Sequence, residues 1–193
     1  MAEQKSQYKL VATTGLARAE PVNEAWPEFT VTELAELPVW WLSVSAGGEA
    51  AFSKACEKAF GTALPQQRHF SDGGQVRIIW AGDRQWFVTG HEGAMPGAVE
   101  KAGYATDQSD GWIAIRITGE KTRDVMEKLC GIDLHASVFP TGATARAPIE
   151  GMISVIACED AGAGTFVILF QRSSARSFLE HMRHAAHSTS PRQ

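Results

Sequence analysis

Apolar and polar residues recur along the middle of the chain at spacings that predict strands and helices in a regular order. A run rich in β-branched and aromatic residues predicts a strand over 38–45. Apolar residues at helical spacing, with a glycine after the last of them, predict a helix over 49–60. Two strands, 75–81 and 85–89, then flank a tight turn that is typical of a hairpin. The pattern next predicts a short helix and an extended piece, at 95–102 and 105–109.

The same order of elements returns in the second half, at an offset of roughly 74 residues. The pattern predicts a strand over 112–118 and a helix over 120–130 that ends before Gly131. Two strands joined by a glycine-rich turn and a last amphipathic helix follow, at 149–158, 165–171 and 174–187. An internal repeat of this kind decides the architecture of a chain.

Each strand–helix–strand–strand–helix unit is most of a split βαβ, ferredoxin-like motif. Two such units predict an α+β protein made of two ferredoxin-like halves, with antiparallel sheets and helices packed against them. The alternative is a doubly wound parallel sheet, which alternating strands and helices would also build. The two tight hairpins favour the first architecture, because a hairpin joins antiparallel strands.

This pattern divides the chain into two halves, 36–110 and 111–187. Residues 1–35 show weak patterning and contain Pro21 and Pro27. They are therefore predicted to form an N-terminal arm that lies on the rest of the molecule rather than a core element. Residues 188–193 are predicted to be a frayed tail.

Composition and charge exclude several classes of protein. The chain has 193 residues, of which 44% are hydrophobic and 21% charged, so it can bury a sizeable core. Its net charge is −4 and no stretch is basic, which argues against a nucleic-acid partner. No apolar run approaches the roughly 18 residues of a membrane span, and the start lacks the apolar core of a signal peptide. The three cysteines are odd in number and widely spaced, so neither a disulfide framework nor a metal site is expected. We expect a cytoplasmic protein with no membrane partner.

Three short motifs could carry chemistry, and each has a structural alternative. Gly162-Ala163-Gly164 is a fragment of a dinucleotide fingerprint, but a predicted strand follows it, which favours a hairpin turn. Gly47-Gly48 could offer free N–H groups to an anion, yet no P-loop lysine follows, which favours a tight connection. Three histidines in the last helix could bind a metal, or their charge could be favoured by the helix C-terminus: His181, His184 and His187.

A polar cluster, Asp107, Ser109 and Asp110, precedes the strand over 112–118. As catalysts these residues would need a base or a metal that the sequence does not provide, so a role in a turn or cap is favoured. The chain also lacks the Gly-x-Ser-x-Gly motif of a nucleophile elbow. The residues therefore predict no catalytic, cofactor-binding or metal site on this chain.

Tryptophan is unusually frequent, with six copies. Trp40 and Trp41 are adjacent on one predicted strand, so their rings point to opposite faces and cannot both enter one core. Trp40 lies in the apolar set with Leu42 and Val44 and is predicted to face the core. Trp41 lies on a mixed face that would meet solvent, the N-terminal arm or a partner. Because tryptophan is enriched at interfaces, Trp41 and Trp112 are predicted as interface residues.

Six short stretches of the chain recur, in the same order, in one known family. They are 78–86, 106–112, 117–119, 128–134, 138–142 and 171–173. The positions that carry the match are Trp80, Gly82, Asp83, Trp86, Asp107, Ser109, Asp133, Leu134, Phe139 and Gly142. Asp83 stands where the family usually has a proline, and aspartate also suits turns. On these stretches, the chain resembles the gamma subunit of heterotetrameric sarcosine oxidase.

The resemblance implies both a fold and a function. That subunit is similar to the folate-binding fold of glycine-cleavage aminomethyltransferases, which has paired ferredoxin-like halves. The implied complex oxidatively demethylates sarcosine to glycine, with hydrogen peroxide and either formaldehyde or 5,10-methylenetetrahydrofolate. Its alpha, beta and delta subunits would be the partners of this chain. They would carry FAD, FMN, NAD, zinc and tetrahydrofolate, and this chain would be a structural subunit without a cofactor.

Two functional hypotheses follow. The first is a non-catalytic subunit that binds its partners through aromatic strands. The second is an independent folate-dependent aminomethyl-transfer enzyme. The transferases carry a Gly-Tyr-Thr-Gly-Glu motif whose carboxylate belongs to the folate site, and this chain lacks it: residues 157–166 read Ala-Cys-Glu-Asp-Ala-Gly-Ala-Gly-Thr-Phe. That difference favours the first hypothesis.

Overall fold

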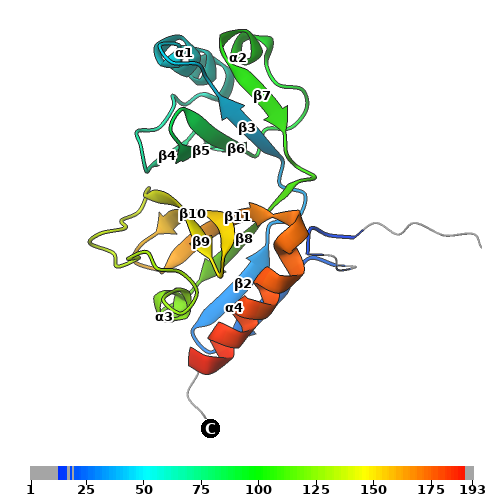
Figure 1. Cartoon of the computed structure of the whole chain (residues 1–193), viewed down its shortest axis with the longest axis vertical. Coiled ribbons are helices and arrows are strands. Elements are labelled where there is room, and N and C mark those ends of the chain that lie inside the picture. Colours follow the sequence, from blue (N-terminus) through cyan, green and yellow to red (C-terminus); the bar gives the residue numbers. More distant parts are fainter. Residues whose placement is uncertain (1–12, 17, 19, 190–193) are drawn as a thin grey trace, which may run out of the picture.

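Four layers build the protein, in the order helices, sheet, sheet, helices (Figure 1). The computed structural model describes residues 13–16, 18 and 20–189. Two helices, α1 (Glu49–Phe60) and α2 (Gly97–Ala102), cover the outer face of a five-stranded sheet. Two more, α3 (Thr122–Met126) and α4 (Ala175–Thr189), cover the outer face of a six-stranded sheet. The inner faces of the two sheets pack against each other.

The first sheet has the strand order β4-β5-β6-β3-β7, and all neighbouring strands are antiparallel. Without β4, this is the order of a ferredoxin-like unit, in which β6 lies between β3 and β5. The strands are β3 (Val39–Ser43), β4 (Phe70–Asp72), β5 (Arg77–Gly82), β6 (Gln85–Thr89) and β7 (Tyr104–Asp107).

The second sheet has the order β1-β2-β8-β11-β10-β9 and is also antiparallel throughout. A short 3-10 turn, Arg172–Ser174, leads from its strand β11 into α4. The strands are β1 (Asn23–Trp26), β2 (Phe29–Glu33), β8 (Trp112–Thr118), β9 (Thr144–Ile149), β10 (Met152–Asp160) and β11 (Thr165–Gln171).

The two sheets repeat one another, which confirms the predicted α+β fold of two ferredoxin-like halves. Strands β4, β5, β6 and β3 of the first sheet correspond in order to β9, β10, β11 and β8 of the second. The parallel-sheet alternative is wrong, because hairpins fix neighbouring strands in opposite directions. The strand beside β3 and the strand beside β8 come from different parts of the chain. In the first sheet this strand is β7, which follows α2, whereas in the second sheet it is β2, which comes from the segment before the repeat.

The N-terminal segment contributes to the core, so the prediction of an arm over 1–35 is wrong for its described residues. The β1–β2 hairpin belongs to the second sheet, and Phe29 and Val31 are buried in its core. The next inward position is Glu33. An inward carboxylate interrupts the apolar alternation that would identify β2 as a strand. The hairpin is therefore hard to predict from the sequence.

Several element boundaries differ from the prediction. The helix predicted over 120–130 ends early, as α3, and turns follow it to Cys130. The strand predicted over 149–158 corresponds to β10, and β9 before it was not predicted apart from Ile149; Glu150 and Gly151, which both have positive φ as in a type I′ turn, join the two strands. Strand β4 was not predicted, since it has only three residues. Helix α4 continues into the predicted tail, and the remainder of that tail, 190–193, lies outside the described residues.

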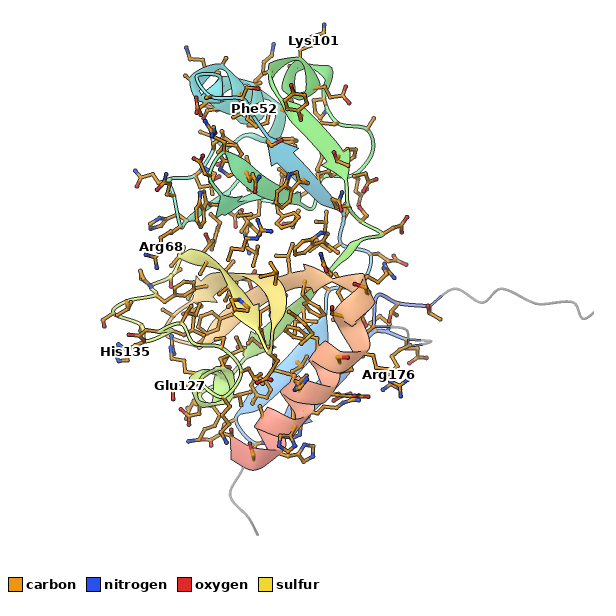
Figure 2. The ribbon with its side chains drawn as sticks, in the orientation of Figure 1. Phe52, Arg68, Lys101, Glu127, His135 and Arg176 are labelled. Atoms are coloured by element: carbon orange, nitrogen blue, oxygen red, sulfur yellow. The ribbon has the colours of Figure 1, made fainter. Side chains whose placement is uncertain are left out.

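Three apolar clusters hold the layers together. One lies between the sheets and includes Val39, Phe87 and Leu169. A second fills the space between the first sheet and its helices, where Phe52 of α1, labelled in Figure 2, lies. Its ring packs beside that of Trp86. The third lies between the second sheet and its helices and contains, among others, Ile115, Met126, Phe166, Phe178 and Met182.

Strand β3 is covered on both faces, which changes the expected role of Trp41. As predicted, Trp40 and Leu42 face the helices. Trp41 packs against the cluster between the sheets, with its ring edge-on to Phe87 at a centroid distance of 4.8 Å. The face expected to meet solvent, the arm or a partner thus lies against the other sheet of the same chain. An interface role for Trp41 stays a prediction, and it would use only the exposed part of the ring.

Candidate functional site

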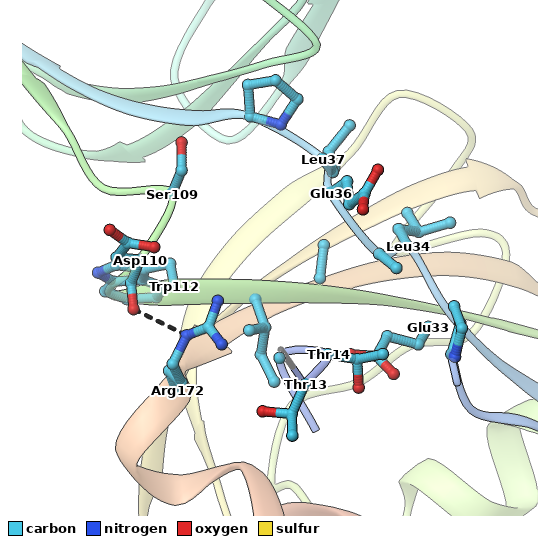
Figure 3. A pocket seen from close by; sticks show the side chains of 16 residues that line it. Thr13, Thr14, Glu33, Leu34, Glu36, Leu37, Ser109, Asp110, Trp112 and Arg172 are labelled. Atoms are coloured by element: carbon cyan, nitrogen blue, oxygen red, sulfur yellow. Dashed lines mark hydrogen bonds between the residues drawn. The ribbon is translucent and has the colours of Figure 1, made fainter. Parts of the chain in front are cut away.

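Two connections run between the sheets, and a cavity of about 590 Å³ lies beside them (Figure 3). Residues 34–38 lead from β2 to β3, and residues 108–111 lead from β7 to β8. The lining combines backbone of both connections with a few polar and aromatic side chains. Among these are Glu33, Glu36, Ser109, Asp110, Trp112 and Arg172. The site thus brings together parts of the chain that are far apart in sequence.

Glu33, on one side of the cavity, has a structural role. Glu33 is only 5% exposed. Its Oε1 accepts a hydrogen bond from the Leu16 N–H at 2.9 Å, and its Oε2 accepts one from the Val22 N–H at 3.0 Å. Buried polar groups are stable only when paired in this way. The carboxylate therefore attaches the N-terminal segment to β2 and is not free for acid–base chemistry.

Arg172, on the other side of the cavity, has only some of its hydrogen-bond donors paired. The Nε of Arg172 donates to the Asp110 carbonyl oxygen at 2.8 Å, and its backbone N–H donates to Gly111 O at 2.9 Å. Neither Nη atom of Arg172 has a hydrogen-bond partner among the described residues, and Figure 3 shows the guanidinium beside the cavity. The cavity can therefore offer guanidinium donors to a polar group. Its described lining residues include no paired nucleophile and base.

The cluster around Ser109 forms a turn at the same crossing. Asp107 Oδ1 accepts a hydrogen bond from the Ser109 N–H at 2.9 Å, and the bonds from Ser109 lower the pKa of the Asp107 carboxyl. The Ser109 hydroxyl accepts a bond from the Val39 N–H at 3.1 Å. These contacts fasten the connection between the halves to the start of β3. Trp112 packs on Phe87, with a centroid distance of 4.6 Å, in the cluster between the sheets.

The family-motif residues of the β5–β6 hairpin have structural roles in the first sheet. Trp80 and Trp86 are opposite one another in the hairpin, and Trp86 packs on Phe52. Gly82 ends β5 and Asp83 and Arg84 form the turn, where the two side chains pair at 2.9 Å. The positive φ in this turn belongs to Arg84 rather than to Gly82. These residues do not line the cavity.

The remaining motif residues lie in the loop between α3 and β9. Leu134 and Phe139 are buried, and Phe139 stacks on Phe166. Asp133 accepts a hydrogen bond from the His135 N–H at 2.8 Å, which shapes the turn. Gly142, with a φ of +90°, accepts a bond from the N–H of Phe70 in the first sheet. The motif is thus spread over three places, and only Ser109 of its residues lines the cavity.

A cluster of charges between the sheets could not be predicted from the sequence. Glu159 of β10 pairs with Arg77 of β5 at 2.5 Å and with Arg116 of β8 at 2.6 Å. Arg77 also pairs with Asp72 of β4, at 2.9 Å. The partners come from both halves of the chain, and no local spacing marks them. The cluster contains no nucleophile, and it connects the two sheets.

The histidines and cysteines occupy separate surroundings. His181 lies 3.7 Å from Glu150, whereas His187 Nδ1 bonds to the Arg183 carbonyl oxygen. Over the described ranges, no three metal-ligating residues come together. All three cysteines are buried, and burial raises the pKa of the Cys56 thiol to about 12. No helix in the described part of the chain is long and apolar enough to span a membrane.

Comparison with known proteins gives a likeness in fold. No family model and no curated protein match the chain. A matching solved structure is a chain of heterotetrameric sarcosine oxidase from Corynebacterium sp. U-96, in complex with pyrrole 2-carboxylate. The TM-score is 0.75 at 20% identity, and the match covers 89% of this chain and 90% of that one. The two chains are therefore nearly equal in length and share one fold along almost all of it.

Proposed function

We propose that this chain is the non-catalytic gamma subunit of a complex of the heterotetrameric sarcosine oxidase type. The observation that carries the proposal is the fold shared with a chain of such an enzyme over nearly the whole of both chains. The six family stretches in the sequence, which follow the family's order, support it independently. Fold alone does not fix function, so the proposal depends on both observations together.

The placement of the reactive side chains supports a structural role. A thiol nucleophile must ionise near neutral pH, and burial raises the pKa of the Cys56, Cys130 and Cys158 thiols. The best-buried carboxylates, Glu33 and Glu159, already hold backbone or arginine partners. The family-motif positions of the chain lie in turns and in the cores. The described residues thus suit a scaffold better than an active site.

The proposed complex would oxidatively demethylate sarcosine to glycine in the cytoplasm. Hydrogen peroxide and either formaldehyde or 5,10-methylenetetrahydrofolate would be its other products. The alpha, beta and delta subunits would be the partners, and they would carry FAD, FMN, NAD, zinc and tetrahydrofolate. This chain would add surface and rigidity to the assembly.

Co-expression with alpha, beta and delta subunits of this enzyme type tests the proposal. We expect the chain to co-purify stoichiometrically with them and the complex to release hydrogen peroxide from sarcosine. The chain purified alone should show no flavin absorbance and no sarcosine oxidation. Flavin bound to the isolated chain, or sarcosine turnover by it, would contradict the non-catalytic role. Tetrahydrofolate binding by the isolated chain would support the aminomethyl-transfer hypothesis instead.

A further inference from the structure

Strand β7 is an edge of the first sheet, and its outward backbone groups have no partner in the described part of the chain. The direction of each group follows from the ladder. Gln108 N–H donates to Val39 O, and Gly90 N–H donates to Pro38 O, so odd residues of β3 bond toward β7 and even residues toward β6. In an antiparallel pair the bonded positions alternate. The N–H and C=O groups of Ala105 and Asp107 therefore point away from β3.

The repeat shows what covers this edge in the other half. Strand β2 holds the position in the second sheet that β7 holds in the first. There the outward groups are paired, because β1 lies antiparallel along β2 with Val31 opposite Glu24. The Glu33 N–H, which also points outward, donates to Val22 O at 2.7 Å. One fold thus contains the same edge twice, once covered by an antiparallel strand and once open.

Two of the other three described edges are protected, as edges of stable sheets usually are. Strand β9 contains Pro148, and the N–H of Thr144 at its start donates to the Arg68 carbonyl oxygen, in the turn before β4, at 2.7 Å. On the outer edge of β4, the Phe70 N–H donates to the carbonyl oxygen of Gly142, in the loop before β9. On the third edge, β1, the ion pair of Glu24 and Arg183 attaches the strand to α4, while the outward groups of Asn23 and Ala25 have no partner among the described residues. Strand β7 has no proline, lysine or register shift.

The side chains of β7 indicate the chemistry of what would pair with it. Tyr104 is 67% exposed, more than any other large hydrophobic residue in the described part of the chain. It lies opposite Ser43, on the face of the sheet that turns toward the second sheet. Asp107 lies on the other face, opposite Trp40, and no cation pairs with its carboxylate among the described residues. An incoming strand would meet an apolar surface at one end and a negative charge at the other.

We propose that β7 is a docking edge for an extended segment of a partner subunit, which adds to the first sheet as an antiparallel strand. Main-chain hydrogen bonds to Ala105 and Asp107 would provide the affinity, as in other cases of strand addition. The segment carries an apolar side chain against Tyr104 and a lysine or arginine beside Asp107. This inference rests on the proposed function, which supplies the partner subunits.

Amide hydrogen exchange at residue resolution tests the docking edge on the wild-type chain. In the isolated chain the outward amides of Ala105 and Asp107 should exchange rapidly, whereas the inward amide of Thr106 should be slow. In the complex with the alpha, beta and delta subunits, exchange at the two outward amides should slow at least about tenfold, the expected scale for a new hydrogen bond. Thr106 serves as the internal control.

A matched pair of variants tests the same edge by affinity. Ala105→Pro removes one outward donor and leaves the bonds to β3 in place, which an edge position tolerates. Ala105→Ser keeps the donor and is the control. We expect the proline variant to weaken assembly by about tenfold and the serine variant to leave it within about twofold. Circular dichroism of both variants checks that they are folded.

The outcomes separate this inference from the proposed function. If the chain does not assemble with these subunits, the proposed function fails and the docking edge fails with it. If it assembles while exchange at Ala105 and Asp107 is unchanged, the proposed function stands and only the docking edge is overturned. Concentration-dependent protection of the same amides in the isolated chain would identify a second copy as the occupant and would also overturn it.

Discussion

Arg77 of the first sheet donates from Nη1 to Oε1 of Glu159 in the second sheet, at a distance of 2.5 Å. Arg116 donates from Nε to the other oxygen of the same carboxylate, at 2.6 Å. The side chain of Glu159 is only 14% exposed. A single carboxylate thus holds two guanidinium groups at the contact of the two halves, and charge-assisted bonds of this kind are among the strongest in proteins.

Replacing Glu159 by glutamine should destabilise the fold by about 3 kcal/mol, because it leaves Arg116 without a counter-charge and Arg77 with Asp72 alone. The free energy of unfolding, measured by urea titration with tryptophan fluorescence, checks this. Asp83→Asn is the control, since Asp83 pairs with Arg84 at an exposed turn and should change stability by less than about 0.5 kcal/mol. Equal effects of the two substitutions would contradict a special role for Glu159.

The same cluster should make the protein sensitive to acid. Burial alone would raise the pKa of Glu159, but the hydrogen bonds from Arg116 and Arg77 outweigh it and hold the pKa below its ordinary value of 4.5. A bond from Arg77 likewise lowers the pKa of Asp72. The folded state therefore binds fewer protons than the unfolded one in acid. The stabilisation is complete above the ordinary pKa and is lost as pH falls through the lowered value.

The measurement is the free energy of unfolding between about pH 6 and about pH 3. We expect it to decrease steeply toward the acid end in the wild-type chain. In Glu159→Gln the decrease should be shallower, because one of the titrating groups is gone. Parallel curves for the two proteins would show that other carboxylates carry the acid sensitivity.

Trp41 should contribute to the stability of the isolated chain, contrary to what its place on a mixed face of the strand suggests. Its ring packs edge-on against Phe87 and lies under the guanidinium of Arg146, 5.7 Å from the ring centroid. Trp41→Ala should therefore destabilise the chain by roughly 2–4 kcal/mol. Tyr104→Ala, at an exposed aromatic residue, is the control and should stay within about 0.5 kcal/mol. A stable Trp41→Ala monomer would return Trp41 to the role of an interface residue.

The repeat could be predicted from the sequence because its elements have simple periodicities. Helix α1 and strands β6, β8 and β11 were predicted with the bounds that the structure gives. Their apolar residues recur at the spacing of one element, and glycine-containing turns separate them. The surroundings of strand β3 could not be predicted in this way. Its two faces are covered by different layers, and a single strand cannot show that a second sheet lies beyond it.

The candidate site was harder to predict for a related reason. Glu33 and Arg172 line one cavity although most of the chain separates them in sequence. The sequence does not mark Glu33 as part of a site, because its partners are backbone N–H groups far away along the chain. The polar cluster at Ser109 was visible as a turn, but its contact with Val39 across the two connections depends on the tertiary fold. Local signals predict turns and strands, whereas the site is made of long-range contacts.

The three cysteines should be unreactive in the native protein. Cys56 is completely buried, and the resulting desolvation raises the pKa of its thiol to about 12, far from the range in which a thiolate forms. Burial raises the pKa of the Cys130 and Cys158 thiols as well. Titration with a thiol reagent at about pH 8 should therefore give little reaction in the folded chain and three equivalents after denaturation. Rapid reaction of one native thiol would reveal an opening that the packed structure does not show.

Glu33→Ala should detach the N-terminal segment from the second sheet. The substitution removes the acceptor for the Leu16 and Val22 N–H groups, and both amides lie in buried surroundings. An unpaired buried donor costs about 1–3 kcal/mol, so the segment before β2 should open more often while the rest of the sheet stays intact. Limited proteolysis should then cut the variant near residues 20–22 faster than the wild-type chain. Thr30→Ala is the matched control: it lies on the opposite face of the same strand, its hydroxyl bonds to Thr118 of β8 rather than to the N-terminal segment, and it should be cut at the wild-type rate. If both variants are cut alike, the carboxylate of Glu33 does not hold the segment, and the ladder between β1 and β2 does so without it.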